Sequence, residues 1–197
     1  MNASAPVSER VAVILESACR VVARDGAHGL RMAAVAEEAG VSKALVHYYF
    51  STRRELLRHA FAFSEERLAA AVEELLAPLP DAAARLEHAL LASLDPEPPW
   101  SEQRALWNEV WSTMRFDDLL RPLVEDAYRA WVERIVGLVR GGAEDGSLAP
   151  PADPVATGWR LAAAADGIDS MLYLGLLDRR RARELVRGAI ERELPRG

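Results

Sequence analysis

The stretch from Met32 to Phe50, MAAVAEEAGVSKALVHYYF, constrains the fold of this chain more than any other segment. Val35, Ala36 and Ala39 fall on one face of a helix, because steps of three and four residues return to the same side. Gly40 then marks the end of this helix, since glycine readily adopts the left-handed conformation of a C-terminal turn. The segment therefore predicts a short helix followed by a tight turn.

A second short helix is expected directly after the turn, over residues 43–50. Ser42 is a suitable N-cap because its hydroxyl can accept a hydrogen bond from a backbone N–H of the first turn. Val46 and Tyr49 repeat at a step of three and should point inward. The side chains expected to point outward are Lys43, Ala44, Leu45, His47 and Tyr48. This layout is typical of a helix-turn-helix, whose second helix enters a DNA groove, although two helices of an ordinary bundle share the pattern.

The flanking segments predict two longer helices. An apolar stripe at helical spacing indicates a helix over about residues 8–25 that ends at Gly26. Downstream, Thr52 and Glu55 form the pattern of a capping box for a helix over about residues 53–77. The upstream stripe consists of Ile14, Leu15, Ala18, Val22 and Ala23.

Over residues 11–57 the sequence resembles the TetR family of bacterial transcription regulators. The matching segments are ILESACRVVARDGAHGL, VAEEAGVSKALVHYYF and STRRELL. The resemblance implies a DNA-binding head at residues 8–52, which recognises a palindromic operator in double-stranded DNA. It also implies a helical body at residues 53–197, which binds a small-molecule effector and forms a homodimer.

The rest of the chain has helical character, and half of all residues are hydrophobic, which is enough for a large core. The expected helices of the body span about residues 81–94, 101–114, 118–140 and 154–174, and a last one begins near 178. The expected N-caps are Asp81, Ser101, Asp153 and Asp178. GGAEDGSLAPP is expected to be a loop. Together with the N-terminal helices this predicts an all-α fold of about nine helices.

Composition narrows the class of protein. Cys19 is the single cysteine, which excludes an intramolecular disulfide and fits a cytoplasmic location. Residues 1–7 are expected to be disordered, and MNASAPVSER has no apolar core of the kind that a signal peptide needs. The most apolar run, residues 161–177, contains Asp166 and Asp169, which argues against a membrane span.

The net charge of −6 is unevenly distributed. Residues 1–60 contain eight basic and six acidic side chains, a balance of +2, which leaves −8 on the remainder. A slightly basic head on an acidic body suits a protein that presents one end to a polyanion, although chance can produce a difference of this size.

Lys43 is the single lysine among 24 basic residues, and near a helix start it can reach guanine O6 and N7 or a phosphate. An ordinary exposed lysine is the alternative. The family resemblance implies that Arg53 binds phosphate where relatives usually carry a lysine. Three positions depart from the usual family pattern. Arg31 stands where family members often have a Thr or Ser cap, His47 replaces the usual tyrosine, and Ala44 replaces a common glycine. The family's usual operator sequence is therefore not expected for this chain. The predicted DNA-contacting residues are Arg31, Ser42, Lys43, Ala44, Leu45, His47, Tyr48, Thr52 and Arg53.

The body offers a set of large apolar side chains with one acid that could bind an effector. These predicted ligand-binding residues are Trp107, Trp111, Met114, Tyr128, Trp131 and Asp166. They favour a small apolar or aromatic effector, and tryptophan rings beside an acid would favour a cation. Ordinary core packing is the alternative for each residue.

The last two helices are predicted to form the homodimer interface, because one has small residues for close approach and the other has an isolated apolar stripe. The predicted interface residues are Gly158, Ala162, Ala165, Leu185, Val186, Ala189 and Ile190. In the alternative arrangement, the stripe packs only within its own chain.

The sequence as a whole favours a ligand-responsive DNA-binding regulator, most simply a repressor that an effector releases from its operator. A DNA-binding relative without an effector, and an all-helical enzyme with a purely structural helix-turn-helix, are the alternatives. No metal-ligand spacing, phosphate-binding glycine loop or catalytic triad occurs in the sequence, so we expect neither a cofactor nor enzymatic activity.

Overall fold

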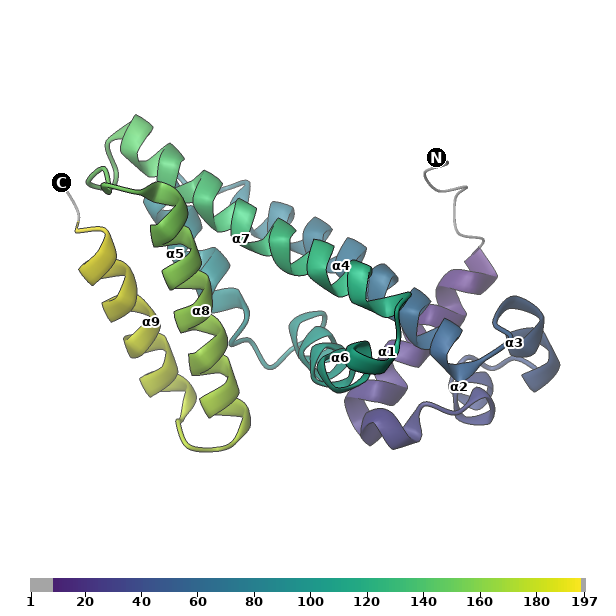
Figure 1. The fold of residues 1–197 in the computed structure, drawn as a ribbon. Coiled ribbons are helices and arrows are strands. Elements are labelled where there is room, and N and C mark those ends of the chain that lie inside the picture. Colours follow the sequence, from purple (N-terminus) through teal and green to yellow (C-terminus); the bar gives the residue numbers. More distant parts are fainter. Residues whose placement is uncertain (1–8, 196–197) are drawn as a thin grey trace. The chain divides into compact units, whose positions relative to one another are not determined.

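The computed structural model describes residues 9–195, except for the side chains of Ala27 and His28 (Figure 1). Within residues 9–195 the chain forms nine α-helices, one 3-10 turn and no strand, which confirms the all-α prediction. The elements are α1 (Glu9–Gly29), α2 (Met32–Glu38), α3 (Lys43–Tyr49), α4 (Arg53–Leu76), α5 (Ala82–Ala92), α6 (Trp100–Thr113), η1 (Met114–Phe116), α7 (Leu120–Asp145), α8 (Pro154–Tyr173) and α9 (Arg179–Glu193). The predicted disorder of residues 1–7 lies outside the described residues.

The chain folds into two compact units. The first unit comprises the described residues up to Ala69 together with Glu97–Val124, and so contains α1, α2, α3, α6, η1 and most of α4. The second unit comprises Ala70–Pro96 and the described residues from Glu125 onward, and so contains α5, α8, α9 and most of α7. The first unit thus combines the predicted DNA-binding head with α6.

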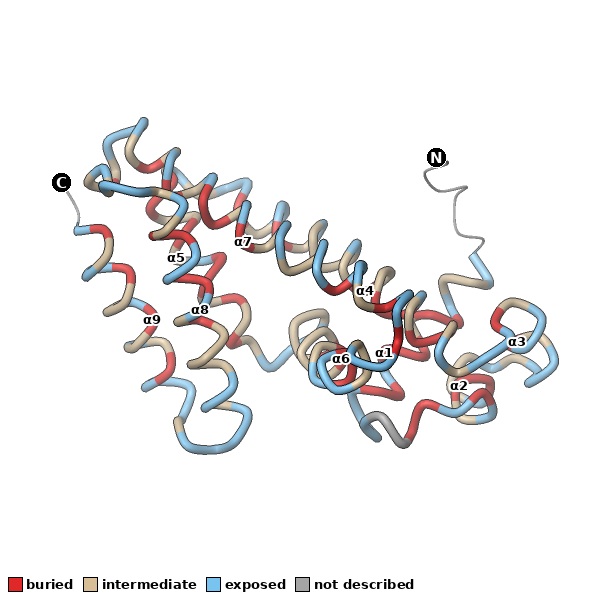
Figure 2. Tube along the Cα trace, viewed as in Figure 1, coloured by how far each residue is buried: buried red, intermediate tan, exposed pale blue. Residues whose placement is uncertain are grey.

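The core of the first unit is built from the apolar faces of α1, α4 and α6 (Figure 2). Its largest fully buried side chains are Ile14, Leu30, Leu56, Leu57, Phe61, Leu106 and Leu120. The predicted stripe of α1 is buried except for Ala23, which is exposed. The buried thiol of Cys19 donates a 3.7 Å hydrogen bond to the Ala60 carbonyl, and burial raises the pKa of Cys19 to about 12, which indicates a structural thiol.

One buried cluster of the second unit forms where α7 and α8 pack together. Val132, Val136 and Ala162 are buried in one cluster, against which Tyr128 and Trp131 pack. At Gly158 an added Cβ would overlap the Val136 side chain, so the missing side chain allows α8 to approach α7 closely.

Of the five N-caps predicted beyond α3, four are confirmed, because their side chains accept hydrogen bonds from the first turn of the following helix. These caps are Thr52, Asp81, Asp153 and Asp178. The prediction for Ser101 is wrong: α6 begins one residue earlier, at Trp100, and Pro99 occupies the cap position without a side-chain hydrogen bond. The Ser101 N–H in the first turn instead donates a 3.2 Å hydrogen bond to the Glu97 carbonyl, so backbone replaces a side-chain cap.

The segment predicted as the loop GGAEDGSLAPP is partly helical, because α7 continues to Asp145 and turns only at Gly146, where φ is +75°. An added Cβ at Gly142 would overlap Leu148, whose backbone N–H donates a 3.0 Å hydrogen bond to the Gly142 carbonyl. Gly146 therefore lets the chain reverse direction after α7, and Gly142 leaves room for Leu148 to pack against the helix end.

Candidate functional site

The helix-turn-helix forms as the sequence predicts. Gly40 has φ +64° in the turn after α2. The N–H of the next residue, Val41, donates a 2.9 Å hydrogen bond to the Ala36 carbonyl and so satisfies a carbonyl at the C-terminal end of α2. The Ser42 hydroxyl accepts a 3.1 Å hydrogen bond from the Leu45 N–H and caps α3. Local sequence signals thus fix both the turn and the start of α3.

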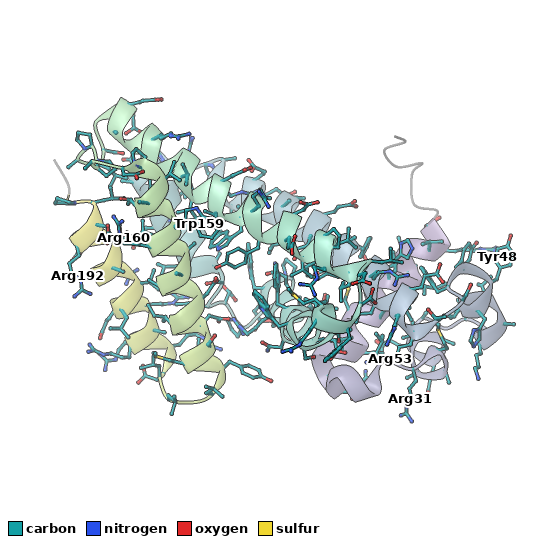
Figure 3. The ribbon with its side chains drawn as sticks, in the orientation of Figure 1. Arg31, Tyr48, Arg53, Trp159, Arg160 and Arg192 are labelled. Atoms are coloured by element: carbon teal, nitrogen blue, oxygen red, sulfur yellow. The ribbon has the colours of Figure 1, made fainter. Side chains whose placement is uncertain are left out.

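The outer face of α3 is open to solvent. Val46 is buried and Tyr49 is half-buried, as predicted, while Leu45 is half-buried rather than fully outward. The exposed side chains of this face are Lys43, Ala44, His47 and Tyr48. Tyr48 has 80% of its surface exposed and extends away from the helix (Figure 3). This face presents one cation, two hydrogen-bonding rings and a methyl group.

Two arginines of α1 hold α2 in place through one carboxylate. Glu38 accepts a 2.9 Å hydrogen bond from Arg20 Nε and a 2.7 Å hydrogen bond from Arg24 Nη1. These hydrogen bonds lower the pKa of Glu38. At the opposite end of α2, Arg31 is exposed in the cap position and makes no capping hydrogen bond, as its replacement of Thr or Ser predicts.

The start of α4 carries a variant of the predicted capping box. Thr52 Oγ1 accepts a 3.1 Å hydrogen bond from the Glu55 N–H, and Glu55 Oε2 accepts a 2.7 Å hydrogen bond from the Ser51 N–H rather than from Thr52. Ser51 and Thr52 are both exposed. The polar start of α4 therefore faces solvent within the first unit.

Arg53 makes internal contacts that the sequence did not suggest. Its Nε donates a 3.0 Å hydrogen bond to the Leu30 carbonyl, and its Nη2 lies 3.0 Å from Oε1 of Glu109 on α6. Two further ion pairs join α4 to the segment from α6 to α7, Arg58 with Asp117 at 3.4 Å and Arg67 with Glu102 at 3.4 Å. All three carboxylates are buried, so two arginine–carboxylate pairs attach α6 to α4 and a third attaches the connection before α7.

A second group of side chains joins α4 to α6 around Glu65. Its Oε1 accepts a 2.9 Å hydrogen bond from Gln103 Nε2 and a 3.0 Å hydrogen bond from Trp107 Nε1. The Trp107 ring lies edge-to-face with Phe61 at 5.2 Å and tilted against Trp111 at 5.8 Å between centroids. We call Phe61, Glu65, Gln103, Trp107 and Trp111 the Glu65 cluster.

Among the described side chains, the Glu65 carboxylate accepts hydrogen bonds from neutral donors. Burial raises the pKa of Glu65, and the hydrogen bonds from Gln103 and Trp107 only partly oppose that rise. Both donors are neutral, so they satisfy hydrogen bonding without compensating charge. Glu65 is not among the ligand-binding residues predicted from the sequence, whereas Trp107 and Trp111 are.

The remaining predicted ligand-binding residues divide between the units. Met114 belongs to the first unit and is half-buried in η1. In the second unit the Tyr128 hydroxyl donates a 2.7 Å hydrogen bond to Asp166, and its ring lies 6.1 Å from that of Trp159. Burial raises the pKa of Asp166, the Tyr128 hydrogen bond lowers it, and Asp169 raises it. Trp131 packs against the α7–α8 core.

Most predicted interface residues are packed inside the single chain. Gly158, Ala162, Ala165, Val186 and Ile190 are buried, while Leu185 and Ala189 are half-buried. The large exposed apolar residues of α8 and the turn after it are Val155, Trp159, Met171, Tyr173, Leu174 and Leu176 (Trp159 is labelled in Figure 3). The exposed positions of α9 are instead dominated by arginine and glutamate.

The described residues meet neither the requirements of a metal site nor those of a membrane-spanning helix. Among the described side chains, no three His, Cys, Asp or Glu come together in a group that could hold a metal ion. None of the helices between residues 9 and 195 combines the length and the apolar character needed to cross a membrane.

Two family profiles match the chain. The profile for bacterial regulatory proteins of the tetR family matches residues 14–60, which contain α2 and α3. The profile for the C-terminal part of BetI-type transcriptional repressors matches residues 82–195, more than half of the chain. Curated proteins provide no match.

Solved structures of similar proteins extend over almost the whole chain. A protein described as a TetR-family transcriptional regulator from Rhodococcus sp. is 29% identical, with a TM-score of 0.80 over 94% of this chain and 99% of that chain. A protein described as a transcriptional regulator from Saccharomonospora viridis, solved in complex with choline, is 28% identical, with a TM-score of 0.83 over 92% of this chain and 95% of that chain. A TetR transcription regulator from Haloarcula marismortui shares the fold at 21% identity, with a TM-score of 0.80 over 95% of this chain and 99% of that chain.

The matched profiles contain the helix-turn-helix at one end and the body helices at the other. Together with the capped, solvent-open α3, they show that this chain is a transcriptional regulator belonging to the TetR family.

Proposed function

We propose that the protein is a homodimeric repressor that binds a palindromic operator through α3 and is released by a small organic cation. The observation that carries the DNA-binding part is the exposed face of α3, where Lys43, His47 and Tyr48 extend outward from a helix with a fixed start. The repressor role is supported by the match to the BetI-type transcriptional repressor profile. Such a protein acts on DNA in the cytoplasm and needs no catalytic activity.

Each predicted contact residue has a distinct role in this proposal. Lys43 reaches a guanine edge or a phosphate, and Ala44 and Leu45 contact thymine methyl groups. His47 and Tyr48 bind phosphate oxygens as hydrogen-bond donors. The remaining phosphate contacts come from helix starts, namely Arg31 at α2, Ser42 at α3, and Thr52 and Arg53 at α4.

The exposed apolar face of α8 supports a homodimer. Val155, Trp159 and Ala163 follow one another at steps of four residues and are all exposed, so they form one side of the helix. Pairing this face with a second copy across a two-fold axis would bury it. The two-fold would also place two α3 helices in successive major grooves, about 34–36 Å apart.

The Glu65 cluster supports a cationic effector. The Glu65 carboxylate is half-buried, and its hydrogen-bond donors among the described residues are neutral, while indole faces attract cations. The similar regulator from Saccharomonospora viridis binds choline, a quaternary ammonium ion of this kind. We therefore assign the effector to the class of small organic cations and its carboxylate contact to Glu65.

A two-part binding experiment tests the proposal. The duplex that flanks the protein's own gene is labelled, and its binding is followed by fluorescence anisotropy while choline is added. We expect the protein to bind this duplex and choline to weaken the binding, because an inducer must bind the DNA-free conformation more tightly. Absence of binding to the duplex would contradict the proposed regulatory target.

The effector site is tested by Glu65→Gln, with Asp166→Asn in the second unit as its matched control. Choline binding, read from tryptophan fluorescence, should weaken about tenfold or more in Glu65→Gln, since an interaction with a charged group is lost. Asp166→Asn should retain the affinity of the unmodified chain. If only Asp166→Asn loses choline binding, the effector site lies in the second unit.

A further inference from the structure

We infer that Glu109 limits the affinity of the protein for DNA by holding Arg53 in an internal ion pair that competes with a backbone phosphate. This inference rests on the proposed DNA-binding role of the helix-turn-helix and its flanking helix starts. Glu109 would then set how strongly the first residue of α4 contributes to DNA binding.

The geometry of the pair allows competition. Arg53 is the first residue of α4 and follows α3 by only a short connection, residues 50–52. Its side chain is 41% exposed, whereas the Glu109 side chain is 7% exposed. The arginine can therefore reach solvent, while the carboxylate on α6 stays buried.

The two possible partners of Arg53 are chemically equivalent. A guanidinium binds a carboxylate and a phosphate with the same charge-assisted hydrogen bonds, so one contact excludes the other. When Arg53 turns to a phosphate, Glu109 loses its cationic partner while it remains buried, which carries a desolvation penalty. The hydroxyl of Thr113, 3.4 Å from Glu109 Oε1, is a neutral donor and cannot replace the lost charge. This penalty weakens the phosphate contact.

The pair also connects the DNA-binding head to α6, which carries Gln103, Trp107 and Trp111 of the Glu65 cluster. Glu109 follows Trp107 by two residues on α6, and Arg53 binds the carbonyl of Leu30 in the connection between α1 and α2. A displacement of α6 would therefore alter both the Glu109 contact and the availability of Arg53.

Glu109→Gln tests the competition, because glutamine has nearly the same shape but no charge. Binding to a duplex of fixed mixed sequence is measured by anisotropy over a salt series, without any effector. We expect Glu109→Gln to bind roughly three- to tenfold more tightly at low salt than the unmodified chain. The slope of log affinity against log salt should become steeper by about 0.9, the value for one additional phosphate contact.

Two further variants separate competition from a general structural effect. Arg53→Gln should remove the whole gain when it is combined with Glu109→Gln, but should cause a smaller loss in the unmodified background. Glu102→Gln removes the matched buried acid that pairs with Arg67 further along α4, and should leave affinity and salt slope unchanged.

Unchanged affinity and slope in Glu109→Gln, or a gain that persists after Arg53→Gln is added, would overturn the inference. A large loss from Arg53→Gln alone, equal to that in the Glu109→Gln background, would also overturn it. Failure of the unmodified chain to bind any duplex would instead refute the proposed function on which the inference rests.

Discussion

Trp107 donates a 3.0 Å hydrogen bond from its indole N–H to Glu65, whose pKa is raised by burial. The interaction satisfies one lone pair of the carboxylate and leaves its negative charge uncompensated. Such an arrangement reduces the stability of the folded state, which is common where a residue serves a ligand rather than the fold. A substitution at Glu65 is therefore expected to weaken effector binding while it raises the stability of the folded state.

Glu65→Gln is expected to stabilise the protein at neutral pH by about 0.5–2 kcal/mol, the usual range for favourable single substitutions. The folded pKa of Glu65 lies above the unfolded pKa, so the native state resists ionisation of this carboxyl. Below the unfolded pKa both states are protonated and the penalty is absent; it develops as the pH rises through the folded pKa.

Thermal unfolding at several pH values checks this expectation. The difference between Glu65→Gln and the unmodified chain should shrink as the pH is lowered through the raised pKa of Glu65. The neighbouring Glu66 is exposed, so Glu66→Gln serves as the control and should leave the stability nearly unchanged. Lower stability of Glu65→Gln at neutral pH would show that the carboxylate is compensated in the folded protein.

Lys43→Ala is expected to weaken binding to the operator by about 1–3 kcal/mol and to relax the base preference at one position, if Lys43 reads a guanine edge. Competition binding against a set of single-base operator variants measures both effects. Arg140 on α7 is also exposed, and Arg140→Ala in the second unit is the control for the loss of one positive charge. An equal loss on every sequence would assign Lys43 to a phosphate instead.

Trp159→Asp on α8 is expected to convert the homodimer into monomers, because a charge at the centre of an apolar contact is costly to desolvate. Analytical ultracentrifugation gives the oligomeric state, and circular dichroism checks that the helices remain. Ala130→Asp on the exposed side of α7 is the control. A Trp159→Asp variant that still sediments as a dimer would place the interface on another surface.

The features that could be predicted from the sequence are those that depend on neighbouring residues. Gly40 and Ser42 define the turn and the start of α3 by their own backbone and hydroxyl chemistry, and the structure has both as predicted. The spacing of Val46 and Tyr49 likewise identified the inner side of α3, because helical periodicity is a local property.

The features that could not be predicted depend on contacts between distant segments. Glu65 lies in the segment SEER, which in the sequence looks like an ordinary polar helix surface. Its donors Gln103 and Trp107 follow 38 and 42 residues later, and only the packing of α4 on α6 brings them together. The ion pair of Arg53 with Glu109 could not be predicted for the same reason. The sequence therefore indicated only a phosphate-binding role for Arg53.

The same limit applies to the predicted interface stripe of the last helix. Val186 and Ile190 are spaced for an apolar face, and the structure buries both within the chain. Periodicity identifies an apolar face but not the surface that covers it. The exposed residues of α8, including Trp159, became visible as interface candidates only once the buried side of the helix was known.

Selection of bound duplexes from a random-sequence DNA pool tests whether the protein recognises a palindromic operator, because every possible operator sequence competes in the same pool. We expect the unmodified chain to enrich an inverted repeat with half-site centres about 10–10.5 base pairs, or a multiple of this, apart. Lys43→Ala should enrich a repeat that is degenerate at one position in each half-site. Enrichment of no sequence at all, or of a site without two-fold symmetry, would refute recognition of a palindromic operator by a dimer.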